Sequence, residues 1–446
     1  MTSTHSYNWT HRSVLAYAQG RDPIKLITEA ARDLVLKARE SGWEGPPFNP
    51  LFIADMLNVK IEANSSISDA RLLELGDGAK IEFNPQQPRE RVRFSIAHEL
   101  AHLLFPDWHE QVRNRAQLSF TNDAWQLEML CNLAASEFVL PIGSLSGFAT
   151  IPPIEALMRL RRQYDVSAEA FLTRVVKVSE VPLGLLVTSP TGPSGRARTY
   201  RVDYFVRSAT ASRLSLPRSE IPDHSIIQTC TAIGYTDNAV EDWITGSPTL
   251  VECVGVPGYP GTAYPRVLAL VRFDQVDQPI QPLKIIHGDI FNLRGSGPKL
   301  VCQMVNDRAT KWGGGVARQM SRRFPDAEKM FTDSFLHVPR GQRLGEVIFT
   351  AATDEVTIAS MIAQEGFGRS SSPRIRYAAL SQALLGVASR ALQQGESVHL
   401  PKIGTGASGG DWSTVLEMLR DILVAAGVTV TVYELPPKRP QLELFS

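Results

Sequence analysis

The sequence predicts a multidomain protein that combines α+β and α/β parts. The chain has 446 residues, and at roughly 100–200 residues per domain this suggests two to four domains. Its N-terminal third mixes long helical patterns with short alternating strands. Its last third alternates apolar strands with helices, which is typical of a mixed or parallel sheet covered on both faces.

The composition excludes several classes of protein. Lys and Arg total 46, as do Asp and Glu, so the formal net charge is zero, whereas a protein that coats nucleic acid needs a basic excess. The 4 cysteines form no CxxC pair, which argues against a cysteine-zinc framework and suits a reducing compartment. We find no apolar core of a secretory signal near the first residue and no apolar run long enough to span a membrane. We therefore expect a soluble, cytoplasmic protein with no membrane partner.

The strongest motif is the segment HELAH, in which His98 and His102 are four residues apart. On a helix such residues lie one above the other, so both imidazoles face a shared point, as two zinc ligands must. Glu99 can reach a water beside the metal and take its proton during attack on a peptide carbonyl. The flanking residues are apolar, so a buried His and Glu here need partners, which a metal supplies. The motif therefore predicts a Zn²⁺ site with Glu99 as general base.

A catalytic zinc site takes three protein ligands and keeps one position open. Glu128 is our first candidate for the third ligand, because it lies on an otherwise apolar helix where an unpaired carboxylate is costly. Glu137 on the same helix is the alternative. His109 is excluded, because it would lie two turns past His102, about 10 Å along a continuing helix.

The segments RVRFSIAHELAHLLF and EMLCNLAASEFVLP together resemble the ImmA/IrrE family of zinc metallopeptidases. The resemblance implies a zincin-like domain over residues 1–150, with His98, His102 and Glu128 as ligands and Glu99 as catalytic base. It also implies a protein substrate, such as a transcriptional repressor, that is cleaved in a stress or phage-defence response.

Two positions depart from the family pattern. Cys131 stands where Ala is usual, and Ala134 stands where Phe is usual. We expect both to be packing positions that leave the zinc assignment unchanged.

Two further segments carry little recognisable chemistry. Residues 151–188 predict a helical subdomain whose YDVS turn resembles a helix-turn-helix. Its basic residues Arg159, Arg161 and Arg162 could contact DNA, but we favour a solvated face on a packed helical block. Residues 189–281 are rich in β-branched residues and turns, and they predict a small β-rich domain.

In the last third, two glycine clusters precede helices, one at residues 313–315 and one at 404–410. Backbone N–H groups at such helix starts suit a diphosphate. With the segments HGDIFN and QMVND, these loops resemble a macro domain over residues 282–436, which implies an ADP-ribose site. Asp289 would bind the adenine amino group, and Tyr433 would pack on adenine. The implied ligand-binding residues are Asp289, Asn306, Gly313, Gly314, Gly315, Val316, Gly404, Thr405, Gly406, Ala407, Ser408, Gly409, Asp411 and Tyr433.

The stretch MIAQEGFGRSSSPRIRYAALSQALLG resembles the macro-domain branch that contains terminal ADP-ribose glycohydrolase and the DarG antitoxins. Hydrolases of that branch use a lysine near the position of Gln364, and this chain has none there. We therefore favour binding over hydrolysis, with Asp411 still able to position a ligand.

The tail at residues 437–446 ends in QLELF, from Gln441 to Phe445. This resembles the pentapeptide with which bacterial replication proteins dock on the DNA sliding clamp, although the tail could also pack on its own domain.

These features favour a zinc endopeptidase that cleaves a partner regulatory protein and is gated by an ADP-ribose-type ligand on the macro domain. One alternative is an ADP-ribose-binding sensor or adaptor with a non-proteolytic zinc site. Another is an ADP-ribosyl hydrolase.

Overall fold

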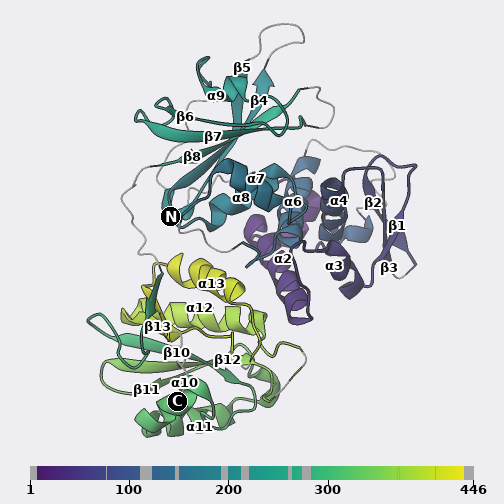
Figure 1. The fold of residues 1–446 in the computed structure, drawn as a ribbon. Helices are drawn as coiled ribbons and strands as arrows, with labels where there is room; N and C mark the ends of the chain where they lie inside the picture. Colours follow the sequence, from purple (N-terminus) through teal and green to yellow (C-terminus); the bar gives the residue numbers. More distant parts are fainter. Residues whose placement is uncertain are drawn as a thin grey trace, which may run out of the picture. The chain divides into compact units, whose positions relative to one another are not determined.

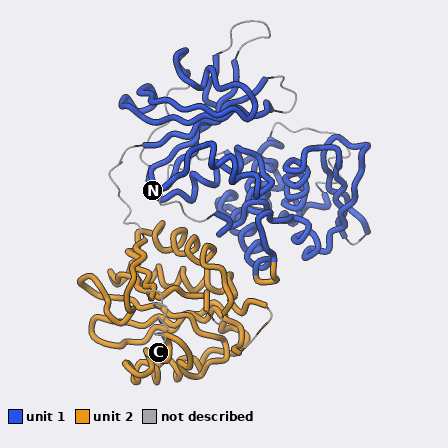
Figure 2. Tube along the Cα trace, viewed as in Figure 1, with its two compact units in different colours: residues 1–39, 43–279 blue, residues 40–42, 280–446 orange. Residues whose placement is uncertain are grey.

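The computed structural model describes residues 8–435 apart from 77, 111–122, 146–149, 192–198, 212–219, 260–263, 274–282, 369, 371 and 407. The chain divides into two compact units (Figure 2), the first made of residues 1–39 and 43–279 and the second of residues 40–42 and 280–446. This division is coarser than the five predicted segments, whose boundaries stay predictions. The predicted clamp-binding tail lies outside the described residues.

The first unit begins with helices that lie beside a small sheet (Figure 1). Its helices are α1 (Arg12–Ala18), α2 (Pro23–Glu40), α3 (Pro50–Met56), α4 (Arg89–His102) and α6 (Ala124–Val139), and its strands are β1 (Lys60–Ala63), β2 (Ala70–Leu75) and β3 (Gly78–Phe83). In α2, Ile27, Ala31 and Val35 are buried at helical spacing. Strand β3 lies in the middle, parallel to β1 and antiparallel to β2, which leaves β2 at an edge. Helix α4 packs on α6 and on β2.

The rest of the first unit is a pair of helices on a five-stranded sheet. The elements are α7 (Ile154–Arg161), α8 (Ala168–Val178), β4 (Leu183–Thr191), β5 (Thr199–Arg207), α9 (Ile226–Thr229), β6 (Thr236–Glu241), β7 (Thr249–Val256) and β8 (Arg266–Arg272), with a 3₁₀ turn at Ala209–Ala211. The strand order is β5-β4-β8-β7-β6, and every pair is antiparallel.

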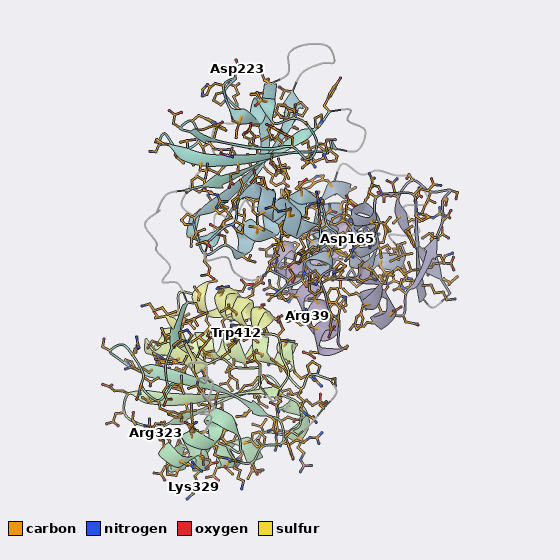
Figure 3. All side chains as sticks on the ribbon, viewed as in Figure 1. Arg39, Asp165, Asp223, Arg323, Lys329 and Trp412 are labelled. Atoms are coloured by element: carbon orange, nitrogen blue, oxygen red, sulfur yellow. The ribbon has the colours of Figure 1, made fainter. Side chains whose placement is uncertain are left out.

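Helices α7 and α8 are held in the first unit by charged contacts and apolar packing. The buried Glu252 carboxylate accepts the Ile154 N–H at 3.1 Å and pairs with Arg272. Arg89 at the start of α4 pairs with Asp165 at 2.9 Å. Asp165, which is labelled in Figure 3, lies in the segment between α7 and α8. Phe171 on α8 is fully buried, and α8 packs on β4 and β5. These contacts favour the packed helical block over a helix that reads DNA.

The second unit is an α/β layer structure, as predicted. Its strands are β9 (Lys284–His287), β10 (Lys299–Asn306), β11 (Val347–Ala351), β12 (Val356–Gln364), β13 (Ser397–Pro401) and β14 (Val430–Glu434). Its helices are α10 (Gly315–Arg323), α11 (Pro325–His337), α12 (Tyr377–Gln394) and α13 (Trp412–Leu419), with a 3₁₀ turn at Arg340–Gln342 and a π turn at Arg420–Val424. The strand order is β11-β12-β10-β13-β14-β9, and among these described strands only β11 is antiparallel to its neighbour. The predicted multidomain α+β and α/β class is confirmed.

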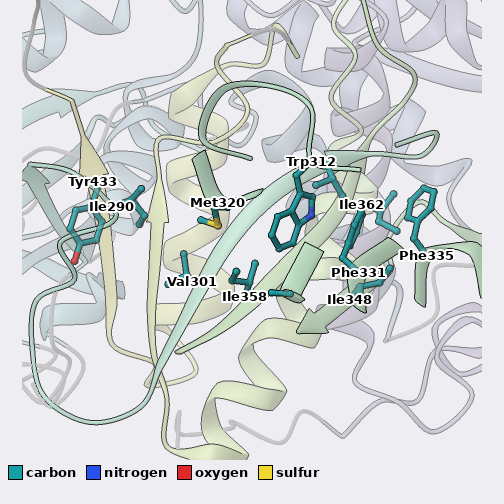
Figure 4. Close-up of a cluster of buried hydrophobic side chains, with 12 residues drawn as sticks. Ile290, Val301, Trp312, Met320, Phe331, Phe335, Ile348, Ile358, Ile362 and Tyr433 are labelled. Carbon is teal, nitrogen blue, oxygen red and sulfur yellow. The ribbon is translucent and has the colours of Figure 1, made fainter. Parts of the chain in front are cut away.

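Side chains on alternate strand positions bury opposite faces of this sheet. On one face, Val301 and Ile358 pack with Phe331 and Phe335 of α11 (Figure 4). Helices α12 and α13 lie on the other side of the sheet (Figure 1). Among the described residues, no helix combines the length and hydropathy that a membrane span requires.

A buried histidine lies in the middle of the second unit's sheet. His399 on β13 is 2% exposed, its Nδ1 lies 3.0 Å from the Tyr433 hydroxyl, and its Nε2 lies 2.9 Å from Ser397 Oγ. Burial, and then the nearby Lys299 charge, lower the pKa of His399 to about 4. The folded protein therefore favours the neutral imidazole.

We predict that His399 makes the stability of the second unit depend on pH. The imidazole has a pKa of about 6.5 when unfolded and a lower pKa when folded, so its contribution is present above about pH 6.5 and is lost as pH falls toward 4. Between pH 7 and pH 5 the free energy of unfolding should fall by about 1 kcal/mol more in the wild type than in His399→Gln, after a discount for solvent screening. Urea unfolding at the two pH values measures this difference. Equal pH dependence in both proteins would contradict the assignment.

Candidate metal centre and nucleotide-binding edge

The last two turns of α4 gather the predicted metal-site residues. His98, Glu99 and His102 each offer a ligand atom, and these atoms lie within 4.8 Å of one another. Glu99 and His102 are buried, and His98 is partly exposed. The spacing of four residues therefore places both imidazoles on one helix face, as the sequence predicts.

Helix α6 brings a carboxylate to both imidazoles. Glu128 Oε2 lies 3.0 Å from His98 Nε2, and Glu128 Oε1 lies 3.9 Å from His102 Nε2. Burial alone would lower the pKa of His98, but the carboxylates of Glu128 and Glu99 outweigh it and raise that pKa. Two imidazole nitrogens and one carboxylate are a ligand set that zinc takes in catalytic sites. The residues present therefore fit a zinc ion.

The backbone of the small sheet holds Glu99. Its Oε2 accepts the backbone N–H of Leu72 at 2.9 Å, and Leu72 lies on the edge strand β2. A carboxylate that accepts a backbone N–H is fixed in direction. This contact was not predictable from the sequence, because it depends on how β2 packs against α4.

Two neighbouring residues of α6 contact the other nitrogens of the imidazoles. Asn132 Oδ1 lies 2.9 Å from His98 Nδ1, and Cys131 Sγ lies 3.4 Å from His102 Nδ1. Cys131 is fully buried, as expected of a packing position, and its sulfur in addition approaches a ring nitrogen of His102. Its spacing of three residues from Glu128 was the signal that could have placed it on the same face.

The alternative third ligand has a different role. Glu137 is buried, and its Oε1 accepts the Ile142 N–H at 2.7 Å, so it holds the turn that follows α6. His109 Nδ1 lies 3.1 Å from Glu74 Oε1, outside the group formed by His98, Glu99 and His102.

The sheet of the second unit brings the predicted nucleotide loops to one edge. Strands β9, β10, β12, β13 and β14 are parallel, so their carboxyl ends share an edge. Asp289 follows β9, the loop that starts at Asn306 follows β10, and the loop at residues 402–410 follows β13. Ligands of open α/β sheets bind at this edge.

Hydrogen bonds join the loops after β10 and β13 through a further loop, the one between β12 and α12. The Gly366 N–H donates to Asp307 Oδ1 at 2.7 Å, which links the loops after β12 and β10. The Arg374 N–H donates to the Ser408 carbonyl at 2.8 Å, which links the loops after β12 and β13. The sequence singled out the segment that holds this loop by a resemblance and by the missing lysine at Gln364, and the structure adds its hydrogen bonds to the two other loops.

The glycines of the predicted loops differ in what surrounds them. A Cβ on Gly404 would lie 2.9 Å from Ile375 Cδ1, and one on Gly410 would lie 2.6 Å from the Gly404 carbonyl oxygen, so both serve close packing. A Cβ on Gly406, Gly313 or Gly314 would have no neighbour within 4 Å.

The loop that begins with Gly313 and Gly314 continues into α10. Gly315 starts α10 with a φ of 52°, a value that favours glycine, and Val316 packs on the sheet core. Thr405 is partly exposed in the second loop, and Gly409 has a φ of 68°. Ala407 lies outside the described residues.

The remaining predicted residues make local contacts. Asp289 is exposed, and its Oδ1 accepts the Phe291 N–H at 3.0 Å, while Asn306 Oδ1 accepts the Arg308 N–H at 3.0 Å. Asp411 caps α13 by accepting the Thr414 N–H at 2.8 Å.

Tyr433 differs from the other predicted ligand residues. It is 3% exposed, and its hydroxyl accepts the Arg294 N–H at 3.1 Å. Burial leaves little of its ring available to a ligand.

Part of the first unit matches a known family. Residues 62–176 match the family model described as the IrrE N-terminal-like domain, a peptidase family. The match confirms the predicted resemblance and supports a metallopeptidase-type site in this segment. It extends to residue 176, so it includes most of the helical block that follows the zinc motif.

The chain is similar to a curated protein over a limited range. Chromodomain-helicase-DNA-binding protein 1-like from Danio rerio is 23% identical over 171 residues, which are 36% of this chain. The chain spans 16% of the length of that relative.

Solved macrodomain structures are also similar. A macrodomain protein from Streptomyces coelicolor is 33% identical, and the match covers 35% of this chain and 100% of that chain with a TM-score of 0.30. DarTG from Thermosipho africanus, solved in complex with ADP-ribose, is 20% identical over 36% of this chain and 43% of that chain, with a TM-score of 0.29. These structures belong to the class that residues 282–436 resemble in sequence.

We predict that replacing Glu128 weakens zinc binding, whereas replacing Glu137 lowers the stability of the fold. Glu128→Ala should weaken zinc binding by more than the roughly 10- to 100-fold that the loss of an outer-shell contact costs, because a ligand is removed. Glu137→Ala should retain zinc but lose about 1–3 kcal/mol of stability, because a buried N–H loses its acceptor. Chelator competition and urea unfolding measure the two effects. The reverse pattern would move the third ligand to Glu137.

Proposed function

We propose that the first unit is a zinc-dependent endopeptidase that cleaves a partner regulatory protein, such as a transcriptional repressor. The observation that supports this most strongly is that the Glu128 carboxylate approaches the Nε2 atoms of both His98 and His102. The Glu99 carboxylate is instead held by a backbone N–H of β2. The match of residues 62–176 to a peptidase family supports the same conclusion. The zinc ligands in this proposal are His98, His102 and Glu128.

Each residue then has a distinct part in peptide hydrolysis. A bound zinc ion supplies Lewis acidity, which makes a water nucleophilic near neutral pH. Glu99 takes the proton of the attacking water and later delivers it to the leaving amine. The Leu72 N–H keeps the Glu99 carboxylate in one orientation for both transfers. Asn132 holds the His98 ring by accepting its Nδ1–H.

The decisive variant is Glu99→Gln, which should keep zinc and lose cleavage. The amide cannot accept a proton, so the rate should fall by about 10²- to 10⁴-fold. The assay detects new protein N-termini by mass spectrometry after the protein is added to a lysate of its source cells. Glu90→Gln, in the first turn of the same helix, is the matched control. Equal cleavage by wild type and Glu99→Gln would exclude the proposed base, and cleavage by neither Glu90→Gln nor the wild type would exclude the protease.

We also propose that the carboxyl edge of the second unit's sheet binds ADP-ribose or a related nucleotide. Three joined loops and an exposed carboxylate, Asp289, lie along this edge. A Cβ built on Gly406 or on Gly313 would meet no atom within 4 Å. The space beside these glycines suits the close approach of a phosphate to backbone N–H groups. Binding without hydrolysis is favoured because Gln364 replaces the expected lysine and because its side chain donates to the Gly366 carbonyl at 2.9 Å.

Two variants should weaken ADP-ribose binding for different reasons. Asp289→Asn keeps an acceptor for the Phe291 N–H but removes the negative charge. Because a charge-assisted hydrogen bond contributes about 1.5–3 kcal/mol, the affinity for ADP-ribose should fall about 10-fold or more. Gly406→Val should fold, because a Cβ at this position meets no atom within 4 Å, but it should abolish binding by filling ligand space. Gly341→Val, also in open space but before β11, is the control. Calorimetric titration with ADP-ribose measures all three. Tight binding by Gly406→Val would contradict the loop assignment.

We propose further that this nucleotide regulates the peptidase. A ligand can shift an equilibrium only if it binds the active and inactive states with different affinity. The cleavage rate should therefore change at saturating ADP-ribose in the wild type and stay constant in Gly406→Val. An unchanged wild-type rate would leave the second unit as a binding module alone.

A further inference from the structure

Helix α6 contacts the metal-site histidines on both sides of their rings. Glu128 approaches the Nε2 atoms, while Cys131 and Asn132, one turn further along the helix, approach the Nδ1 atoms. One rigid helix thus supplies a candidate ligand and an outer contact for each imidazole. The contact of Asn132 is an ordinary hydrogen bond, whereas that of Cys131 uses sulfur.

The contact between Cys131 and His102 is deeply buried. Cys131 is 0% exposed and His102 is 1% exposed, and Sγ lies 3.4 Å from Nδ1. Water therefore has little access to this nitrogen, and a buried ring N–H needs an acceptor. A cysteine sulfur can accept such a hydrogen bond, although weakly.

We propose that Cys131 is a positioning residue that orients His102 for zinc, an inference that rests on the proposed zinc site. An imidazole that binds a metal through Nε2 carries its proton on Nδ1, and the group that accepts this proton sets the tautomer and the ring orientation. In His102 the Nε2 faces Glu128 and the Nδ1 faces Cys131. The Nδ1–H donates to Sγ, and Nε2 is left with its lone pair toward the ligand group.

The geometry favours this role over direct ligation by sulfur. Sγ lies next to Nδ1, whereas the carboxylate oxygens of Glu128 lie next to the Nε2 atoms of both rings. A sulfur ligand would have to reach the opposite side of the His102 ring. Ligation by Cys131 is therefore the competing outcome of the test.

The test measures zinc affinity by chelator competition in the full-length chain. Cys131→Ala should weaken zinc binding about 10-fold, the low end of the roughly 10- to 100-fold range for outer-shell contacts, because sulfur is a weak acceptor. Cys131→Ser keeps an acceptor and should recover most of the affinity. Cys230→Ala removes another fully buried thiol of the same unit, away from the site, and should bind zinc like the wild type.

A cobalt-substituted protein separates positioning from ligation. The wild type should show the visible bands of a nitrogen and oxygen site without the strong near-ultraviolet sulfur-to-cobalt charge-transfer band, and Cys131→Ala should alter the visible bands. A sulfur band that disappears in Cys131→Ala would overturn positioning in favour of ligation. Zinc affinity in Cys131→Ala equal to that of the wild type would overturn the proposal and leave the zinc site intact. Failure of the wild type to bind zinc would instead reject the proposed function.

Discussion

Helix α6 packs along helix α4, and the candidate metal centre depends on this contact. The packing places Glu128 within 3.0 Å of His98 and lets Cys131 and Asn132 reach the far nitrogens of both rings. Helix α4 in turn lies against β2, whose Leu72 N–H fixes Glu99. A change in the register between the two helices would therefore disturb the ligands, their outer contacts and the base together.

The second unit depends on a different constraint, the parallel order of its strands. Because five strands run in one direction, loops that are far apart in the sequence meet at one edge. The loop hydrogen bonds through Gly366 and Ser408 then make this edge a connected surface. Tight contacts at Gly404 and Gly410 shape the loop, while Gly406 leaves room for a ligand.

Sequence periodicity was sufficient for some of these features and insufficient for others. The four-residue spacing of His98 and His102 places them on one helix face whatever the tertiary structure. The apolar sequence around Glu128 singled it out, although the expected burial is wrong, because its side chain is 43% exposed. The contacts of Leu72 and Cys131 require the tertiary packing of β2, α4 and α6, which no local pattern encodes. For the same reason, the sequence could not separate glycines that pack closely from glycines that face open space.

The central claim is that α4 and α6 together form a zinc site. Zinc-edge X-ray absorption spectroscopy of the full-length chain tests it most directly. We predict one zinc ion per chain whose first shell holds nitrogen and oxygen atoms only, with the multiple-scattering pattern of two imidazoles. A first shell without imidazole, or the absence of stoichiometric zinc after loading, would contradict the account.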